Sequence, residues 1–245
     1  MIQAIICFLK KNHMEIKNAR ILITGGATGM GYEMARLFKE LGAEVLICGR
    51  TEKTVIEAAK ELDILGFIAD VSKEKDVENL FKFIEEKWNG LDVLINNAGI
   101  GYFSELVSTT IEDFTRVWDI NVKGAFLVGR EAAKIFTRQD KGNIINIGST
   151  ASQYGFANGS AYVASKFALK GMTECWRAEL RKHNVRVMQI NPSEVVTDFG
   201  EKSGYGSDKN GKKLSASEIA HVALSMLTMH DVGFITDATV WATNP

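Results

Sequence analysis

The feature that most constrains the fold of this chain is a regular alternation between short apolar runs and longer amphipathic stretches. Seven runs are rich in branched residues, at positions 21–23, 45–47, 66–68, 93–95, 144–147, 185–190 and 234–240. Between them lie segments such as residues 73–88, where Val77, Leu80 and Ile84 recur at helical spacing. Strands that are apolar almost throughout are typical of a parallel sheet covered on both faces. The alternation therefore predicts an α/β fold with a doubly wound parallel sheet.

Composition and charge narrow the function classes. The 245 residues are 46% hydrophobic and 24% charged and show no linker, so we expect one domain. Because 29 basic residues stand against 30 acidic ones, the totals give no sign of nucleic-acid or anionic-membrane binding. Cys7, Cys48 and Cys175 lack paired spacing, which favours free thiols in a reducing cytoplasm. The four histidines show no metal-ligand spacing, so we expect no metal site.

The N-terminus carries a short apolar run at residues 2–9, well below the ~20 residues that a membrane span needs. Lys10 and Lys11 follow this run, whereas the charges of a signal peptide precede the apolar segment. Met14 begins a segment that has the pattern of a natural start. We therefore interpret residues 1–16 as an extension outside the fold and residues 17–245 as the folded domain, with a weak interfacial anchor as the alternative.

A glycine-rich segment directly follows the first predicted strand. It reads Thr24-Gly25-Gly26-Ala27-Thr28-Gly29-Met30-Gly31 and opens a predicted helix over residues 32–41. Glycines let the backbone turn sharply and approach a phosphate, and a helix N-terminus offers free N–H groups. The segment therefore indicates a dinucleotide pyrophosphate site, although its glycines are spaced more widely than in the commoner motif. A tight strand-to-helix turn is the alternative.

Polar residues follow the fourth and fifth predicted strands. Asn96-Asn97-Ala98-Gly99 ends the fourth strand, and Ser149 comes just after the run at residues 144–147. The carboxyl ends of parallel strands face the ligand crevice of an open sheet, so we expect both segments to line a ligand. For residues 96–99 alone, a simple turn is the alternative.

Tyr162 and Lys166 lie four residues apart on a helix predicted over residues 160–182, so they share one face. An ammonium group near a phenol favours the phenolate, and we expect the pKa of Tyr162 to be lowered toward neutrality, where it can transfer a proton. A hydroxyl from Ser149 could contact the same substrate oxygen. For Tyr162 and Lys166 alone, a core tyrosine beside a surface lysine is the alternative.

Asn121 lies within a helical pattern over residues 111–138, where asparagine is unfavourable because its side chain competes for backbone hydrogen bonds. Together with Gly124, it predicts a local distortion of this helix. A surface asparagine is the alternative.

In their order and separation, these motifs resemble the short-chain dehydrogenase/reductase family, over roughly residue 17 to the C-terminus. The resemblance implies a single-domain Rossmann fold with a seven-stranded parallel sheet, and a hydride exchanged between NAD or NADP and a carbonyl carbon. It makes Tyr162 the general acid or base, and Ser149 the residue that orients the carbonyl. Lys166 would hold the nicotinamide ribose and tune Tyr162, while Asn121 would support a water that relays protons to Lys166.

The resemblance also implies a set of cofactor contacts. Asp70 would contact adenine and Thr197 the carboxamide, while Ser193 stands where glycine is usual. The full set is Gly25, Thr28, Gly29, Met30, Gly31, Arg50, Asp70, Val71, Asn97, Ala98, Gly99, Tyr162, Lys166, Pro192, Val195 and Thr197.

The end of the second predicted strand bears on the choice between NAD and NADP. A site for NAD places an acidic residue there, bonded to the ribose 2′-hydroxyl. Here Gly49 occupies that position and Arg50 follows, whose guanidinium suits a 2′-phosphate. We therefore expect NADP rather than NAD, with an exposed loop arginine as the alternative.

These observations predict an NADP-dependent ketone or aldehyde reductase, or the reverse alcohol dehydrogenase, acting on a small molecule. Reduction of a 3-oxoacyl thioester falls within this class, although residues 236–245 lack the Asp-Gly-Gly tail usual in such reductases. A non-catalytic NAD(P)-binding sensor or scaffold is the alternative, which the complete set of catalytic residues disfavours.

Two further features concern surfaces. Residues 198–215 are polar and rich in glycine, which suits a lid over the substrate or a solvated connector equally. The predicted helices at 111–138 and 160–182 carry more apolar surface than one sheet face needs, so we expect a homodimer or homotetramer. The residues concerned are Phe114, Val117, Phe126, Phe167, Met172 and Trp176.

Overall fold

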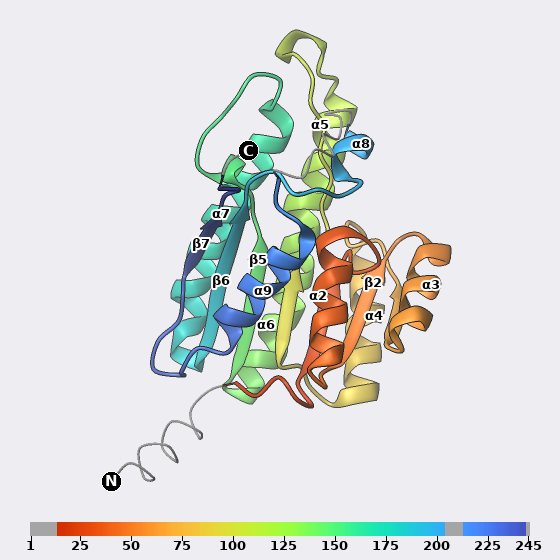
Figure 1. Cartoon of the computed structure of the whole chain (residues 1–245), viewed down its shortest axis with the longest axis vertical. Helices are drawn as coiled ribbons and strands as arrows, with labels where there is room; N and C mark the ends of the chain where they lie inside the picture. Colours follow the sequence, from red (N-terminus) through yellow and green to blue (C-terminus); the bar gives the residue numbers. More distant parts are fainter. Residues whose placement is uncertain (1–13, 204–212, 244–245) are drawn as a thin grey trace.

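The computed structural model describes residues 14–203 and 213–243, and within them seven strands form one sheet. They are β1 (Arg20–Thr24), β2 (Glu44–Gly49), β3 (Leu65–Ile68), β4 (Val93–Asn96), β5 (Gly142–Ile147), β6 (Val185–Pro192) and β7 (Asp237–Val240). All pairings are parallel, in the order β3-β2-β1-β4-β5-β6-β7. The doubly wound Rossmann fold is thereby confirmed (Figure 1). The order reverses between β1 and β4, and such a switch point opens a crevice at the carboxyl ends of the strands.

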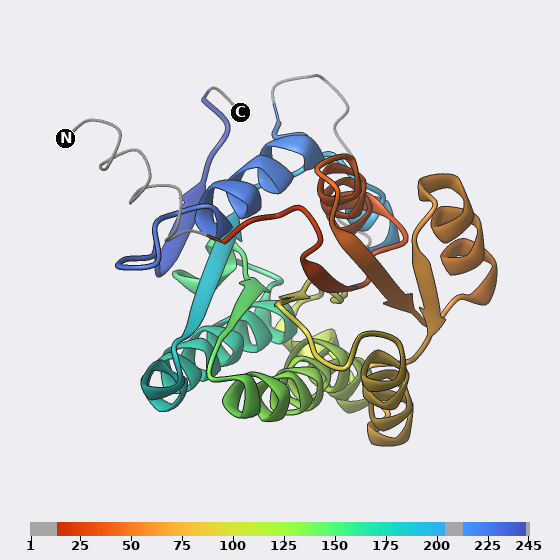
Figure 2. The ribbon, with the colours of Figure 1, turned by 90° about the horizontal axis from the view of Figure 1, so that it is seen from below.

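Helices cover both faces of the sheet (Figure 2). One face carries α2 (Gly29–Glu40), α3 (Glu52–Leu62) and α9 (Ala216–Leu227). The other carries α4 (Glu74–Trp88), α6 (Ala125–Gln139) and α7 (Ser160–Leu180). Shorter elements are η1 (Leu106–Ser108), α5 (Ile111–Trp118), η2 (Asp119–Gly124), η3 (Thr150–Ser152), η4 (Arg181–His183) and α8 (Phe199–Ser203).

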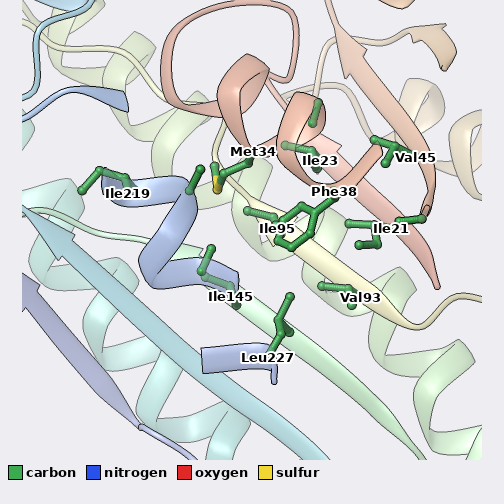
Figure 3. Packing of buried hydrophobic residues seen from close by; sticks show 14 of the residues in the cluster. Ile21, Ile23, Met34, Phe38, Val45, Val93, Ile95, Ile145, Ile219 and Leu227 are labelled. Carbon is green, nitrogen blue, oxygen red and sulfur yellow. The ribbon is translucent and has the colours of Figure 1, made fainter. Parts of the chain in front are cut away.

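Two apolar clusters hold these layers together, because alternate residues of each strand point to opposite faces. On one face, Ile21 and Ile95 meet Phe38 of α2, with Ile219 and Leu227 of α9 nearby (Figure 3). On the other face, the intervening residues pack on α4 and α6; they include Leu22, Leu94, Leu80 and Phe136, all fully buried. Strands buried on both sides explain the near-continuous apolar runs of the sequence.

The helix predicted over residues 111–138 is interrupted. It consists of α5, then the π-helical turn η2, then α6. Asn121 and Gly124 lie in η2, so the predicted distortion is confirmed. A Cβ added at Gly124 would lie 2.8 Å from Cγ2 of Val71, which shows how closely this turn approaches the segment after β3.

The folded part begins earlier than Lys17. Met14 and Ile16 are buried in the cluster on the α2 side, and Sδ of Met14 accepts a hydrogen bond from Asn143 at 3.3 Å. The boundary drawn after residue 16 is therefore corrected, because two isolated apolar residues give no periodic pattern that a sequence can show. Residues 1–13, the rest of the predicted extension, lie outside the described residues. Within the described ranges, every helix is too short or too polar to cross a bilayer.

Candidate active site

The glycine-rich segment is tied to the end of β4 by a compact set of hydrogen bonds. Oγ1 of Thr24 accepts bonds from the backbone N–H groups of Asn97 and Ala98, both at 3.0 Å. Nδ2 of Asn97 donates to the carbonyl oxygens of Thr24 and Gly25, again at 3.0 Å. These bonds join β1 and β4 at the switch point and hold Ala98 beside the glycine segment.

Within this segment, glycine is required by conformation and by space. Gly25 and Gly29 have positive φ values of 61° and 56°, which residues with a Cβ rarely adopt. A Cβ added at Gly31 would lie 2.4 Å from the carbonyl oxygen of Gly25. The segment leads into the N-terminus of α2, where the N-cap residue Thr28 makes no side-chain capping bond. Its first-turn N–H groups and the helix dipole therefore suit the pyrophosphate of a dinucleotide.

Other expected cofactor residues surround this segment. Thr197 lies beside Gly29, since a Cβ added there would be 3.3 Å from Cγ2 of Thr197. Pro192 ends β6, and Val195 pairs with Leu214 in an isolated bridge. Met30 belongs to the first turn of α2, and its side chain packs on the core.

The end of β3 supplies Asp70 and Val71. The Asp70 carboxylate accepts bonds from the backbone N–H and the hydroxyl of Ser72, at 3.0 and 2.7 Å. Val71 is buried against η2. Arg50 is exposed and lines a cavity of about 410 Å³ together with Asp70 and Ser72, while α5 and η2 form the opposite wall. The arginine expected to recognise a phosphate thus shares a cavity with the aspartate expected beside adenine.

Tyr162 and Lys166 are buried residues of α7, and Lys166 reaches the carboxyl end of β5. Nζ of Lys166 donates to the carbonyl oxygen of Ile147 at 2.8 Å and lies 5.7 Å from the centroid of the Tyr162 ring. Ser149 hydrogen-bonds the Tyr162 hydroxyl, and it is oriented as the N-cap of η3, where its Oγ accepts from the N–H of Ala151. The structure therefore brings together the three residues expected at the reacting oxygen.

Burial dominates the ionisation of this pair. It raises the pKa of Tyr162 to about 12, against the lowering effect of the Ser149 hydrogen bond. Burial also lowers the pKa of Lys166 from 10.5 to about 8. The expectation that Lys166 lowers the pKa of Tyr162 is therefore wrong for the protein alone, because withdrawal of the phenol from water outweighs the lowering effect of the Ser149 hydrogen bond.

Asn121 is almost fully buried, and its side chain links three segments. Oδ1 accepts from the N–H of Ile100, and Nδ2 donates to the carbonyl oxygen of Ile100 and to Oγ of Ser165, at 2.8, 2.9 and 3.0 Å. Ser165 in turn donates to the carbonyl oxygen of Tyr162 at 2.7 Å. Asn121 thus fixes the segment after β4 against the helix that carries Tyr162. Gly99 belongs to the same site, since a Cβ added there would lie 3.3 Å from Asn121 Oδ1 and 3.8 Å from Lys166 Nζ.

Sequence reasoning missed two groups of residues. Ser165 completes the link between Asn121 and α7. Phe103 and Phe199 pack on the ring of Tyr162, and Phe156 packs on Phe103. A serine one position before a lysine gives no signal, and the phenylalanines come from separate segments of the chain. Among the described residues, no three His, Cys, Asp or Glu side chains gather as a metal site.

Comparisons with known proteins agree with this geometry. A family model described as short chain dehydrogenase matches residues 19–207. A 3alpha-hydroxysteroid dehydrogenase of Mediterraneibacter gnavus is 33% identical over 193 residues, covering 76% of this chain and 77% of the relative. An NADP-dependent 3-hydroxy acid dehydrogenase of Schizosaccharomyces pombe is 31% identical over 239 residues, covering 90% and 91%.

The fold similarity extends over nearly the whole chain. The crystal structure of a 3-ketoacyl-(acyl-carrier-protein) reductase from Brucella melitensis, complexed with NADH, superposes with a TM-score of 0.87 at 26% identity, covering 93% of this chain and 98% of the other. The family match, the seven-stranded sheet and the glycine segment lead to one conclusion. The chain belongs to the short-chain dehydrogenase/reductase family and is an oxidoreductase that acts on alcohols and ketones.

Proposed function

We propose that this enzyme uses NADP to reduce a ketone or aldehyde, or to oxidise the corresponding secondary or primary alcohol. The observation that carries the proposal is the cluster of Ser149, Tyr162 and Lys166 at the carboxyl end of β5, beside a glycine segment that only a backbone without Cβ atoms can form. A non-catalytic NAD(P)-binding sensor could use Lys166 to hold the ribose, but it would not need the Tyr162 hydroxyl paired with Ser149.

The proposed roles follow from the contacts. Hydrogen bonds from Ser149 and Tyr162 would hold the substrate carbonyl oxygen, and the Tyr162 hydroxyl would give it a proton as the carbonyl carbon accepts a hydride. When bound, the nicotinamide ring supplies that hydride. Lys166 would hold the nicotinamide ribose and favour the phenolate form of Tyr162 after proton transfer.

The role proposed for Asn121 needs refinement. Both Nδ2 protons are donated within the protein, to Ile100 and to Ser165. A water that relays protons to Lys166 would therefore be held by groups other than these two N–H donors. The side chain of Asn121 acts as a positioning group between the segment after β4 and α7.

The choice of NADP rests on the end of β2. Gly49 places no carboxylate there to bond a ribose 2′-hydroxyl, and the exposed Arg50 lines the cavity that also contains Asp70. One relative is named as NADP-dependent, and one similar structure contains NADH, so Arg50 is the residue to test.

Replacement of Tyr162 by Phe tests the catalytic proposal. Because this change removes the proton donor, turnover should fall by about 100-fold or more. NADPH binding, measured by fluorescence titration, should stay within about threefold, since the ring still fits. Tyr32→Phe is the matched control, because its hydroxyl bonds Glu61 on α3. Turnover by Tyr162→Phe within about tenfold of the unmodified enzyme would contradict the proposal.

Replacement of Arg50 by Ala tests the cofactor proposal. A charge-assisted hydrogen bond contributes about 1.5–3 kcal/mol, so kcat/KM for NADPH should fall roughly 10- to 150-fold while that for NADH changes little. Arg138→Ala, which removes the partner of Glu85 near the end of α6, is the control. The further change Gly49→Asp is less clean, since a Cβ there would lie 3.1 Å from Val55. Equal or better use of NADH by the unmodified enzyme would reject NADP as the cofactor.

A further inference from the structure

We propose that the substrate of this site is a compact, uncharged molecule whose carbon skeleton is apolar, such as a ring-containing ketone. The inference rests on the proposed function and adds the chemical class of the substrate. It comes from two phenylalanine rings in direct contact with the ring of Tyr162, and from a third phenylalanine that packs on one of them.

The three rings come from separate segments of the chain. The centroid of Phe103, in the segment after β4, lies 5.4 Å from that of Tyr162, in an edge-to-face arrangement. Phe199, the first residue of α8, lies 5.8 Å from Tyr162 on the same measure. Phe156, between η3 and α7, lies 6.0 Å from Phe103. The carbonyl that bonds Tyr162 would therefore have phenylalanine rings as neighbours of its substituents.

The segments that carry these rings are packed closely. A Cβ added at Gly101 would lie 2.8 Å from Cζ of Phe199 and 2.7 Å from Cβ of Ser203, so the absence of a side chain lets α8 approach the segment after β4. The backbone N–H of Ser104 donates to the carbonyl oxygen of Asn158 at 2.9 Å. This bond ties the segment of Phe103 to the segment of Phe156. Phe103, Phe156 and Phe199 are thus held in one packed surface, which we call the phenylalanine wall.

The opening of this wall is aromatic as well. Phe156 is 42% exposed, so one part of its ring packs on Phe103 and another part is accessible. Tyr154 stacks on Trp241 at 6.3 Å between centroids, and Gln153 donates to Thr239 at 2.8 Å. These contacts anchor the segment of Phe156 to β7 and the residues that follow it.

Two described lysines near the site already have partners. Lys213, which follows the stretch after α8, pairs with Glu194, and Nζ of Lys166 bonds Ile147. A substrate carboxylate placed against phenylalanine rings would lose its hydration and gain no hydrogen bond from them. An apolar ring placed there would instead bury surface on both partners. The wall therefore favours an uncharged, apolar skeleton over that of a hydroxy acid or a sugar.

A pair of matched ketones tests the inference with the full chain and NADPH. The probes are 4-methylcyclohexanone and 4-oxocyclohexanecarboxylate, which share one ring and differ by a methyl group against a carboxylate. We expect kcat/KM to be at least about tenfold higher for the methyl compound. Equal values, or a preference for the carboxylate, would overturn the inference and leave the proposed function intact. Failure to reduce either ketone with NADPH or NADH, together with failure on a broad panel of ketones and aldehydes, would overturn the proposed function and the inference with it.

Substitutions test whether the phenylalanine rings cause the preference for the uncharged ketone. Phe103→Leu and Phe199→Leu should lower kcat/KM for 4-methylcyclohexanone by about fivefold or more, mainly through KM, with NADPH affinity unchanged. Phe83→Leu is the control, because Phe83 of α4 also forms a ring pair, with Phe67 of β3. Phe156→Arg should shift the ratio of the two ketones toward the carboxylate, since it adds a cation at the exposed edge. The assignment of the phenylalanine wall to the substrate is wrong if two results are found together. Phe103→Leu and Phe199→Leu would have the same kcat/KM for 4-methylcyclohexanone as Phe83→Leu, and Phe156→Arg would leave the ratio of the two ketones unchanged.

Discussion

Burial acts in opposite directions on the two ionisable groups at the centre of the site. It disfavours the phenolate of Tyr162 and the ammonium form of Lys166, raising the first pKa to about 12 and lowering the second to about 8. Lys166 compensates with one hydrogen bond to Ile147. A buried cation of this kind costs stability, which indicates that selection for chemistry rather than for folding keeps it there.

This cost gives a prediction with a definite sign. The folded-state pKa of Lys166 lies below its unfolded value of 10.5, so the unfolded chain binds more protons between about pH 8 and 10.5. Stability should therefore rise with pH in that window relative to Lys166→Met, by about 3 kcal/mol at most. Urea unfolding of the cofactor-free proteins at pH 7.5, 8.5 and 9.5 measures the difference. The free energy of unfolding of Lys75→Met, which changes an exposed pair with Glu78, should vary with pH as that of the unmodified protein does. If the difference in stability between the unmodified protein and Lys166→Met stays constant or falls as the pH rises, the assignment is contradicted.

At this scale the sequence predicted positions better than energies. The spacing of Tyr162 and Lys166 placed both on one face of a helix, as found. The direction of the Tyr162 pKa shift was missed, because spacing says nothing about how much water α7 and its neighbours exclude. The phenylalanine wall could not be predicted either, since Phe103, Phe156 and Phe199 come together only when two loops and α8 pack around Tyr162.

At the scale of elements, the interruption between α5 and α6 is the instructive case. Asparagine and glycine are poor helix formers, so a distortion near Asn121 was predictable. That it takes the form of a π-helical turn depends on tertiary contacts, namely the bonds of Asn121 to Ile100 and Ser165 and the approach of Val71 to Gly124. The short β7 shows the same limit, because the sheet, rather than the apolar run at 234–240, decides where pairing starts.

The junction of β1 and α2 supports a prediction about the glycine segment. Gly31→Ala would place a Cβ 2.4 Å from a backbone oxygen, so the segment must shift. We expect a loss of about 1–3 kcal/mol in the free energy of unfolding and at least about tenfold weaker NADPH binding. Gly171→Ala in α7 is the matched control, because a Cβ there meets nothing within 4 Å. Alanine should stabilise that helix by up to about 1 kcal/mol and leave NADPH binding unchanged. Unaltered NADPH affinity in Gly31→Ala would show that this turn does not contact the cofactor.

At the scale of the whole molecule, the helices on the α7 side leave aromatic surface uncovered. Phe126 and Phe167 are 41% and 43% exposed, and Trp118 at the end of α5 is similar. Two residues expected on this surface contribute less than predicted. Val117 is fully buried, and the partly buried Trp176 packs on Gly129 so closely that a Cβ there would lie 2.6 Å from its ring. The apolar surface offered to a partner is therefore smaller than predicted and centred on α6 and the first half of α7.

We propose that this face joins two copies of the chain, because a symmetric interface needs one self-complementary apolar patch. Light scattering at micromolar concentration should report a dimer or a tetramer. The double change Phe126→Ser and Phe167→Ser should shift the protein toward smaller species, since an interface of about 1,000 Å² or more would lose two aromatic anchors. Ile56→Ser is the control: it removes an even more exposed apolar side chain from α3, on the opposite face of the sheet. A monomer in the unmodified protein would refute the proposal, and an equal shift caused by Ile56→Ser would place the interface on a different face.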